Sequence, residues 1–120
     1  MKRVALVVHD DKPRATDAAM ALATACTKRG VETFIVSDDV LPDEVEAIVG
    51  VGGDGTVLRA AALAMTAELP VAGINVGRIG YLAEFARSGG AVLVVTHDAR
   101  AAQYAARTLQ LRNGKLDPTD

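Results

Sequence analysis

The stretch that decides the fold is AIVGVGGDGTVLRAAALAM, which runs from Ala47 to Met65. An apolar run passes through glycines into a segment with helical character. The first amides of such a helix point at one spot, with the positive end of the helix dipole behind them, and such a spot binds phosphate. The glycines permit positive φ and close approach of a ligand, and a threonine can cap the helix or donate to phosphate. The candidate phosphate-binding residues are therefore Gly52, Gly53, Gly55 and Thr56.

One acid, Asp54, lies among these glycines. Its negative charge would repel a phosphate, so a simple phosphate-binding turn does not explain it. A carboxylate beside bound phosphates can hold a metal ion or accept a proton from an attacking hydroxyl, and phosphoryl transfer needs both. The alternative is a tight connection between a strand and a helix in which Asp54 only caps the helix.

Around this stretch the chain alternates short apolar runs with helical patterns. The pattern predicts a three-layer α/β/α sandwich with a mostly parallel, Rossmann-like sheet and a C-terminal β-hairpin. Residues 41–43 are expected to begin a turn or a short helical segment. The expected strands are Val4–Val8, Val31–Val36, Ala47–Val51, Val71–Asn75 and Ala91–Thr96, the helices are Ala15–Arg29, Thr56–Met65 and Asp98–Ala106, and the hairpin is Thr108–Leu116 around Asn113-Gly114.

The 120 residues fit a single α/β domain, residues 1–120. A formal net charge of −2, without a basic block, favours neither nucleic acid nor a membrane surface as a partner. The one cysteine, Cys26, fits a reducing compartment, and no run is long enough to span a bilayer, so we expect a cytoplasmic protein. Unpaired strand edges leave a monomer and a homodimer both open.

Two segments together resemble the N-terminal domain of bacterial NAD kinases. The first, Val51–Ala61, contains GGDGT, which also occurs in diacylglycerol kinases and has a close relative in phosphofructokinases. The second, Pro70–Glu84, contains Gly-x-Asn-x-Gly-x-x-Gly-Tyr-Leu-Ala-Glu and separates NAD kinases from those relatives. Tyr81 stands where the family usually has phenylalanine. The resemblance covers residues 1–86.

The resemblance implies a role for each matching position. Asp54 matches the general base that deprotonates the 2′-hydroxyl of the adenosine ribose of NAD before it attacks the γ-phosphate of ATP. Asp54 and Gly55 match positions that contact the dinucleotide, and Arg59 matches a basic position of the same site. Asn75 and Gly77 match the second loop; the alternative for Asn75 is the polar end of a strand that closes a turn. The implied ligands are ATP or NAD with Mg²⁺; the sequence shows no metal-ligand cluster, and we expect no cofactor to be required.

The resemblance also implies a β-rich C-terminal domain that supplies an Asn-Glu or Asn-Asp pair, and neither dipeptide occurs in these residues. Instead, residues 89–120 resemble the end of an ABC transporter ATPase domain. Strand-Thr-His-Asp matches the switch loop, with His97 at the histidine that contacts the γ-phosphate, and Arg-Asn-Gly-Lys matches the usual last hairpin. The chain lacks that family's phosphate-binding loop and signature motif, so we expect His97 to be an ordinary residue at a strand end.

The combination suggests three functions. The first is an engineered or chimeric α/β protein that joins the two fragments, binds nucleotides weakly at GGDGT and catalyses nothing efficiently. The second is a minimal or split NAD kinase that transfers phosphate from ATP to NAD. The third is a scaffold that binds nothing.

Overall fold

The computed structural model describes most of the chain. The described residues are 2–9, 11–76, 87–89, 91, 93–96, 103 and 105–118. Among them, no helix has the length and apolar character needed to cross a membrane.

The expected order of strands and helices is confirmed up to the fourth strand. Each predicted strand or helix differs from the observed one by no more than two residues at either end. The observed elements are β1 (Arg3–Val8), α1 (Pro13–Lys28), β2 (Glu32–Ile35), β3 (Ala47–Gly52), α2 (Asp54–Ala67), β4 (Val71–Asn75), β5 (Val94–Val95), β6 (Leu109–Arg112) and β7 (Lys115–Pro118).

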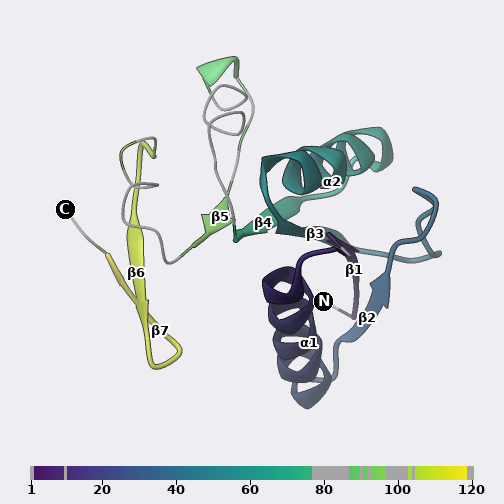
Figure 1. Cartoon of the computed structure of the whole chain (residues 1–120), viewed down its shortest axis with the longest axis horizontal. Helices are drawn as coiled ribbons and strands as arrows, with labels where there is room; N and C mark the ends of the chain where they lie inside the picture. The colour runs from purple at the N-terminus through teal and green to yellow at the C-terminus, as the bar shows by residue number, and fades with distance from the viewer. Residues whose placement is uncertain are drawn as a thin grey trace.

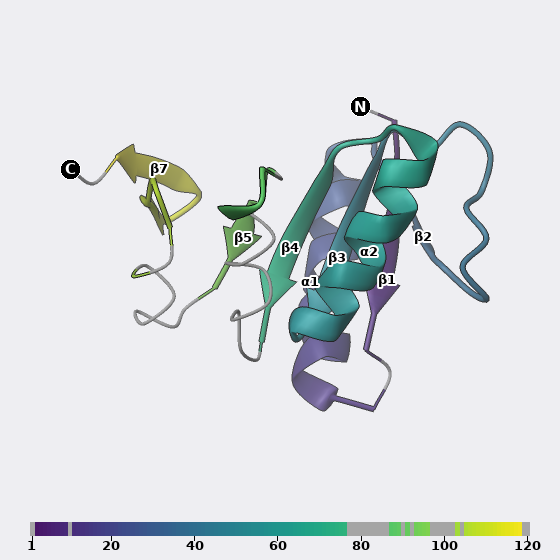
Figure 2. The same ribbon diagram turned by 90° about the horizontal axis from the view of Figure 1, so that it is seen from above.

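Five strands form one sheet in the order β2-β1-β3-β4-β5, and every neighbouring pair is parallel. Helix α1 covers one face of this sheet and α2 covers the other (Figure 1). Seen from above, the strands lie side by side between the two helices (Figure 2). The α/β/α sandwich with a parallel sheet is therefore confirmed.

The strand residues alternate between two apolar layers, as strands covered on both faces do. Ala5, Val7 and Ile48 pack on the α2 side with Ala60 and Ala64. On the other face, Val51 is buried with Ala15 and Ala19 of α1, and Val8, Val49 and Ile74 pack against them. The buried stripe of α1 is thus centred on alanines, which bring the helix close to the sheet, while Cys26 is only half-buried.

Glycines on the α2 face of the sheet allow an even closer approach. A Cβ on Gly50 would lie 3.0 Å from Val57 Cα and 3.0 Å from Ala60 Cβ. A Cβ on Gly73 would lie 2.7 Å from Val57 Cγ1. Because Val57 is 2% exposed, the helix has no free space into which to move that side chain. These two glycines therefore set the distance between α2 and the sheet.

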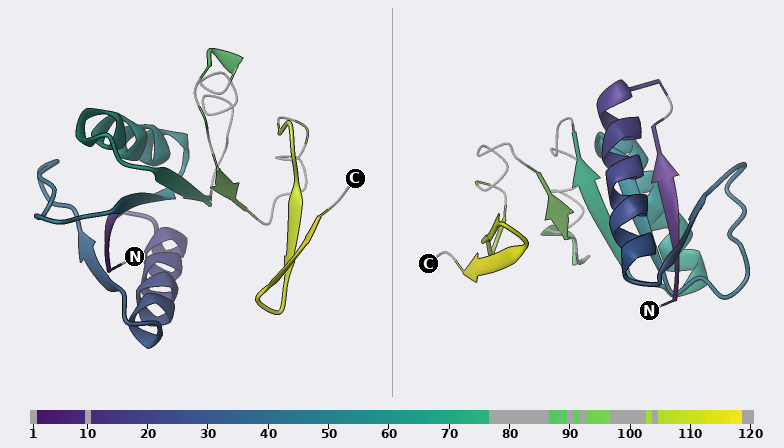
Figure 3. Two further views of the ribbon diagram at one scale, coloured as in Figure 1. Left: turned by 180° about the vertical axis from the view of Figure 1, so that it is seen from behind. Right: turned by 90° about the horizontal axis from the view of Figure 1, so that it is seen from below.

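The connection between β2 and β3 takes the place of a third helix. It runs alongside α2 without regular structure, and Val36, Leu41 and Val45 from it join the core on that face (Figure 3). The sequence predicted that residues 41–43 begin a turn or a helical segment, and the structure has a turn at residues 43–44. Asp38, Asp39 and Glu44 adopt positive φ in this connection.

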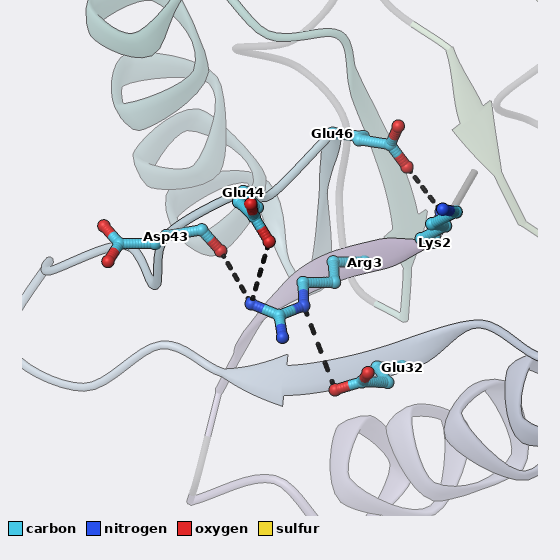
Figure 4. Close-up of polar contacts among 6 residues, drawn as sticks. All are labelled: Lys2, Arg3, Glu32, Asp43, Glu44 and Glu46. Atoms are coloured by element: carbon cyan, nitrogen blue, oxygen red, sulfur yellow. Dashed lines mark hydrogen bonds and ion pairs between the residues drawn. The ribbon is translucent and has the colours of Figure 1, made fainter.

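A cluster of charged groups joins this connection to the amino ends of β1 and β2 (Figure 4). The Arg3 guanidinium lies 3.9 Å from Glu32 and 3.8 Å from Glu44, and donates to the Asp43 carbonyl at 3.1 Å. The Lys2 amide donates to the Glu46 carboxylate, and this hydrogen bond is the main reason why the pKa of Glu46 is lowered. The cluster lies at the edge of the sheet opposite the glycine-rich turn.

The tail matches the prediction in part. Among the described residues of the expected strand Ala91–Thr96, Val94–Val95 is a strand, and it pairs with β4 in parallel. Most of the expected helix Asp98–Ala106 lies outside the described residues, and its last two residues, which are described, are not helical. The β6–β7 hairpin is confirmed, with positive φ at Asn113 and Gly114, and forms a separate two-stranded sheet beyond β5 (Figure 1).

Candidate functional site

The carboxyl ends of three neighbouring strands, β1, β3 and β4, meet at one edge of the sheet. The His9 amide donates to the Val51 carbonyl at 3.0 Å, and the Val76 amide donates to the Gly52 carbonyl at 2.8 Å. Asn75 is opposite Gly52 in the register and is 3% exposed. The segments after the three strands are therefore held together by backbone hydrogen bonds.

The chain turns in opposite directions after β1 and after β3. From β1 it passes through α1 to β2, whereas from β3 it passes through α2 to β4, on the other face of the sheet. Figure 2 shows the two helices on opposite faces of the sheet. In open α/β sheets, such a change of direction separates the loops and leaves the crevice in which ligands bind.

The turn after β3 fits a phosphate. Gly53 is the N-cap of α2, and the first hydrogen bond of the helix runs from the Val57 amide to the Gly53 carbonyl at 3.1 Å. The amides of residues 54–56 precede that bond, so no carbonyl of the helix accepts from them. These amides lie at the positive end of the helix dipole, so the N-terminus of α2 favours the binding of an anion.

The glycines of this turn have different roles, and positive φ is not one of them. Among the described glycines, only Gly30, Gly89 and Gly114 have φ in the left-handed region, so the expected use of positive φ by the turn is wrong. Gly52 is needed for packing, because its Cβ would lie 2.7 Å from Thr56 Oγ1. A Cβ on Gly55 would meet nothing within 4 Å, so this side of the turn is open to a ligand.

Asp54 is the first residue of α2 and is only 9% exposed. An acid is favourable in the first turn of a helix, because the dipole is positive there. Its Oδ1 is buried and accepts no hydrogen bond from the described part of the chain. Asp54 is not the N-cap of the helix, because Gly53 occupies that position.

Other candidate residues differ in how far the structure describes them. Thr56 is not a cap: it is the third residue of α2, 8% exposed, and its side chain packs against Gly52. Arg59 Nε lies 2.6 Å from Asp39 Oδ1, in an ion pair that joins α2 to the β2–β3 connection. Gly77, Tyr81 and His97 lie outside the described residues.

Two residues at this edge were not predicted from the sequence. A Cβ on Gly52 would lie 3.0 Å from His9 Cβ, and a Cβ on Gly53 would lie 3.6 Å from Lys12 Nζ. Both residues come from the segment after β1, some forty residues earlier in the chain. One general feature of the sequence could have indicated them: polar residues that directly follow a buried parallel strand lie at the edge of the sheet where ligands bind.

Residues 36–97, more than half of the chain, match the family model described as the ATP-NAD kinase N-terminal domain. The chain belongs to this family. The match includes β3, the glycine-rich turn, α2 and β4, which carry the site. It also continues past residue 86, where the sequence resemblance was expected to end, and includes β5.

Individual NAD kinases are similar over a longer part of the chain. The NAD kinase of Mycobacterium tuberculosis (strain CDC 1551 / Oshkosh) is 45% identical over 89 residues, covering 71% of this chain and 29% of the relative. The NAD kinase of Bifidobacterium longum subsp. infantis is 37% identical over 95 residues, covering 70% and 28%. That of Moorella thermoacetica is 34% identical over 97 residues, covering 70% and 31%. The chain thus spans less than a third of the length of these relatives.

Proposed function

We propose that this NAD kinase N-terminal domain binds nucleotide phosphates at the GGDGT turn and that the site serves phosphoryl transfer from ATP to NAD. The observation that carries the proposal is the position of Asp54: a buried carboxylate at the N-terminus of α2, at the change of direction of the sheet. Amides that favour phosphate and a group that can accept a proton lie within one turn of helix.

In the proposed reaction, Asp54 accepts the proton of the ribose 2′-hydroxyl of NAD. The oxygen then bonds to the γ-phosphorus of ATP while the bond from that phosphorus to the β,γ-bridging oxygen breaks, so ADP leaves and NADP forms. The amides of residues 54–56 stabilise the charge on the phosphate oxygens. Asn75, buried at the end of β4, borders the same edge and is proposed to orient the nucleotide.

Mg²⁺ fits this site as an ion that arrives on the nucleotide. Among the described residues, no group of three or more His, Cys, Asp or Glu side chains could hold a metal. Mg²⁺ is commonly held by one or two carboxylates together with substrate phosphates, and Asp54 is a carboxylate in that position. When bound, the ion would neutralise part of the negative charge on the phosphates.

The rate of phosphoryl transfer depends on the groups that hold the attacking hydroxyl in line with the γ-phosphate. Positioning supplies much of the rate of phosphoryl transfer, and the relatives are more than three times as long as the part that aligns. We therefore propose weak nucleotide binding as the activity of these 120 residues themselves, with efficient transfer requiring further groups, from a second copy or another segment.

The experiment combines a binding and an activity measurement on the full chain. An amide NMR titration with ATP and then NAD, each with Mg²⁺, is expected to shift the signals of residues 52–56 and 75. Formation of NADP is followed in parallel for the wild type and for Asp54→Asn, which keeps the size of the side chain but cannot accept the proton. Absence of shifts in a well-dispersed spectrum contradicts binding, and formation of NADP at the same measurable rate by both proteins contradicts the role of Asp54.

The origin of the tail stays a hypothesis. Its likeness to an ABC transporter ATPase domain rests on the sequence of residues 91–116, and the NAD kinase match overlaps the beginning of that segment. An engineered junction near residues 87–90 remains compatible with both resemblances. As partners we propose nucleotides, with neither nucleic acid nor a membrane involved.

A further inference from the structure

Lys12 links the segment after β1 to the glycine-rich turn after β3. Its backbone is fixed, because its amide donates to the His9 carbonyl at 3.3 Å and its carbonyl accepts from the Ala15 amide at 3.0 Å. Pro13 begins α1 immediately afterwards. The side chain extends toward the other loop, so that Nζ lies 3.6 Å from where a Cβ on Gly53 would be.

This position places a full positive charge at the start of α2. The partial charge of a helix end is about half an elementary charge, so the ammonium roughly triples the positive charge near the turn. Asp54 acts in the opposite direction, since its carboxylate repels a phosphate that approaches the same amides. A lysine offsets that repulsion and donates directly to phosphate oxygens.

The lysine also borders the open side of the site. Gly53 is half-buried and Gly55 is exposed, with nothing within 4 Å of where its Cβ would be. A polyphosphate lying against residues 53–55 would therefore be contacted by amides from one loop and by the ammonium from the other. Lys12 is exposed, and among the described residues the hydrogen bonds that hold it come from its backbone, so its four-carbon side chain can follow the ligand.

We propose that Lys12 is a binding residue for the polyphosphate of a nucleoside triphosphate at the GGDGT turn. The inference rests on the proposed function and adds a second loop to the site. In this arrangement, the loop after β1 and the loop after β3, which diverge at the change of direction of the sheet, contact the ligand from two sides.

The test uses the full chain and inorganic tripolyphosphate, which has the phosphates of ATP without its base or ribose. Binding is measured by amide NMR titration for the wild type, Lys12→Met, Lys12→Arg and Lys28→Met. The last variant is the matched control, because Lys28 is an exposed lysine at the far end of the same helix. Unchanged spectra of the free variants establish that the fold is intact.

We expect Lys12→Met to weaken tripolyphosphate binding by about tenfold or more, the usual effect of losing a hydrogen bond to a charged group. Lys12→Arg should retain most of the affinity, and Lys28→Met should stay within about twofold of the wild type, as for an exposed charge far from the ligand. The salt dependence should also weaken in Lys12→Met. Equal affinity of Lys12→Met and Lys28→Met, or no saturable shifts at residues 52–56 of the wild type, overturns the inference.

The activity assay separates this inference from the proposed function. If NADP forms and Lys12→Met leaves the KM for ATP unchanged, the proposed function stands and the role of Lys12 fails. If tripolyphosphate binding depends on Lys12 but Asp54→Asn forms NADP at the wild-type rate, the role of Lys12 stands and the proposed role of Asp54 fails.

Discussion

Replacing Gly73 by alanine should destabilise the protein, because it places a methyl group where α2 meets the sheet. The new Cβ would lie 2.7 Å from Val57 Cγ1 and 3.2 Å from Cγ2. Val57 is β-branched and buried, so it cannot rotate away without strain. Overpacking of this kind costs about 1–3 kcal/mol.

The structure also identifies the substitution that should relieve the clash. In the double variant Gly73→Ala, Val57→Ala, the nearest remaining atom of residue 57 is Cβ at 3.5 Å, an ordinary contact distance. Val57→Ala alone should cost about 2 kcal/mol, from two lost methyl groups and the cavity they leave. Since the added methyl fills that cavity, we expect the double variant to lose about 2 kcal/mol rather than the additive value of about 4.

Urea unfolding followed by circular dichroism measures all four proteins of this cycle. With a urea m-value of about 2 kcal/mol/M, each loss of about 2 kcal/mol moves the midpoint by about 1 M. Additive losses in the double variant would refute the reasoning, because they would mean that residues 57 and 73 do not share the space between α2 and β4.

Three further predictions concern other parts of the chain. Gly55→Ala should raise the urea midpoint, because alanine favours a helix by up to about 1 kcal/mol and its Cβ meets nothing, yet weaken tripolyphosphate binding in an NMR titration. The pKa of Glu46 is lowered in the folded protein, so the ionised carboxylate stabilises the fold at any pH above the ordinary pKa of 4.5. This stabilisation is lost as the pH falls through the lower pKa of the folded state. The urea midpoints of the wild type and Glu46→Gln should therefore converge in acid. Gly114→Ala places a side chain at φ +78° and should destabilise the hairpin by about 1–2 kcal/mol, with weaker cross-strand nuclear Overhauser effects between β6 and β7; unchanged effects would contradict this.

The strands were predictable because each is short, apolar and bounded by turn residues. Val71–Asn75 begins and ends where the sequence predicted, since Pro70 precedes it and the polar Asn75 ends the apolar run. The start of α2 was misjudged by two residues, because Gly53 serves as the N-cap and Asp54 already belongs to the helix. A glycine cap leaves no side-chain signal to distinguish it from the rest of a glycine-rich turn.

The site was predictable only where one continuous segment forms it. The GGDGT turn follows from local sequence, but the proximity of Lys12 to Gly53 depends on β1 and β3 being neighbours, and strand order is not written locally. The reason for the glycines was likewise inaccessible. Gly50 and Gly73 are required by the neighbouring Val57, a contact that only the packed structure reveals.

The arrangement of the site also has a consequence for synthesis of the chain. The segments that surround it follow β1, β3 and β4, and the last of them ends near Val76. Every residue of the described site is therefore synthesised before the tail. With the weak binding proposed above, a nucleotide present at its Kd would stabilise the folded sheet by mass action by about 0.4 kcal/mol. The proposed nucleotide binding would then favour the folded state of this region before the tail is synthesised.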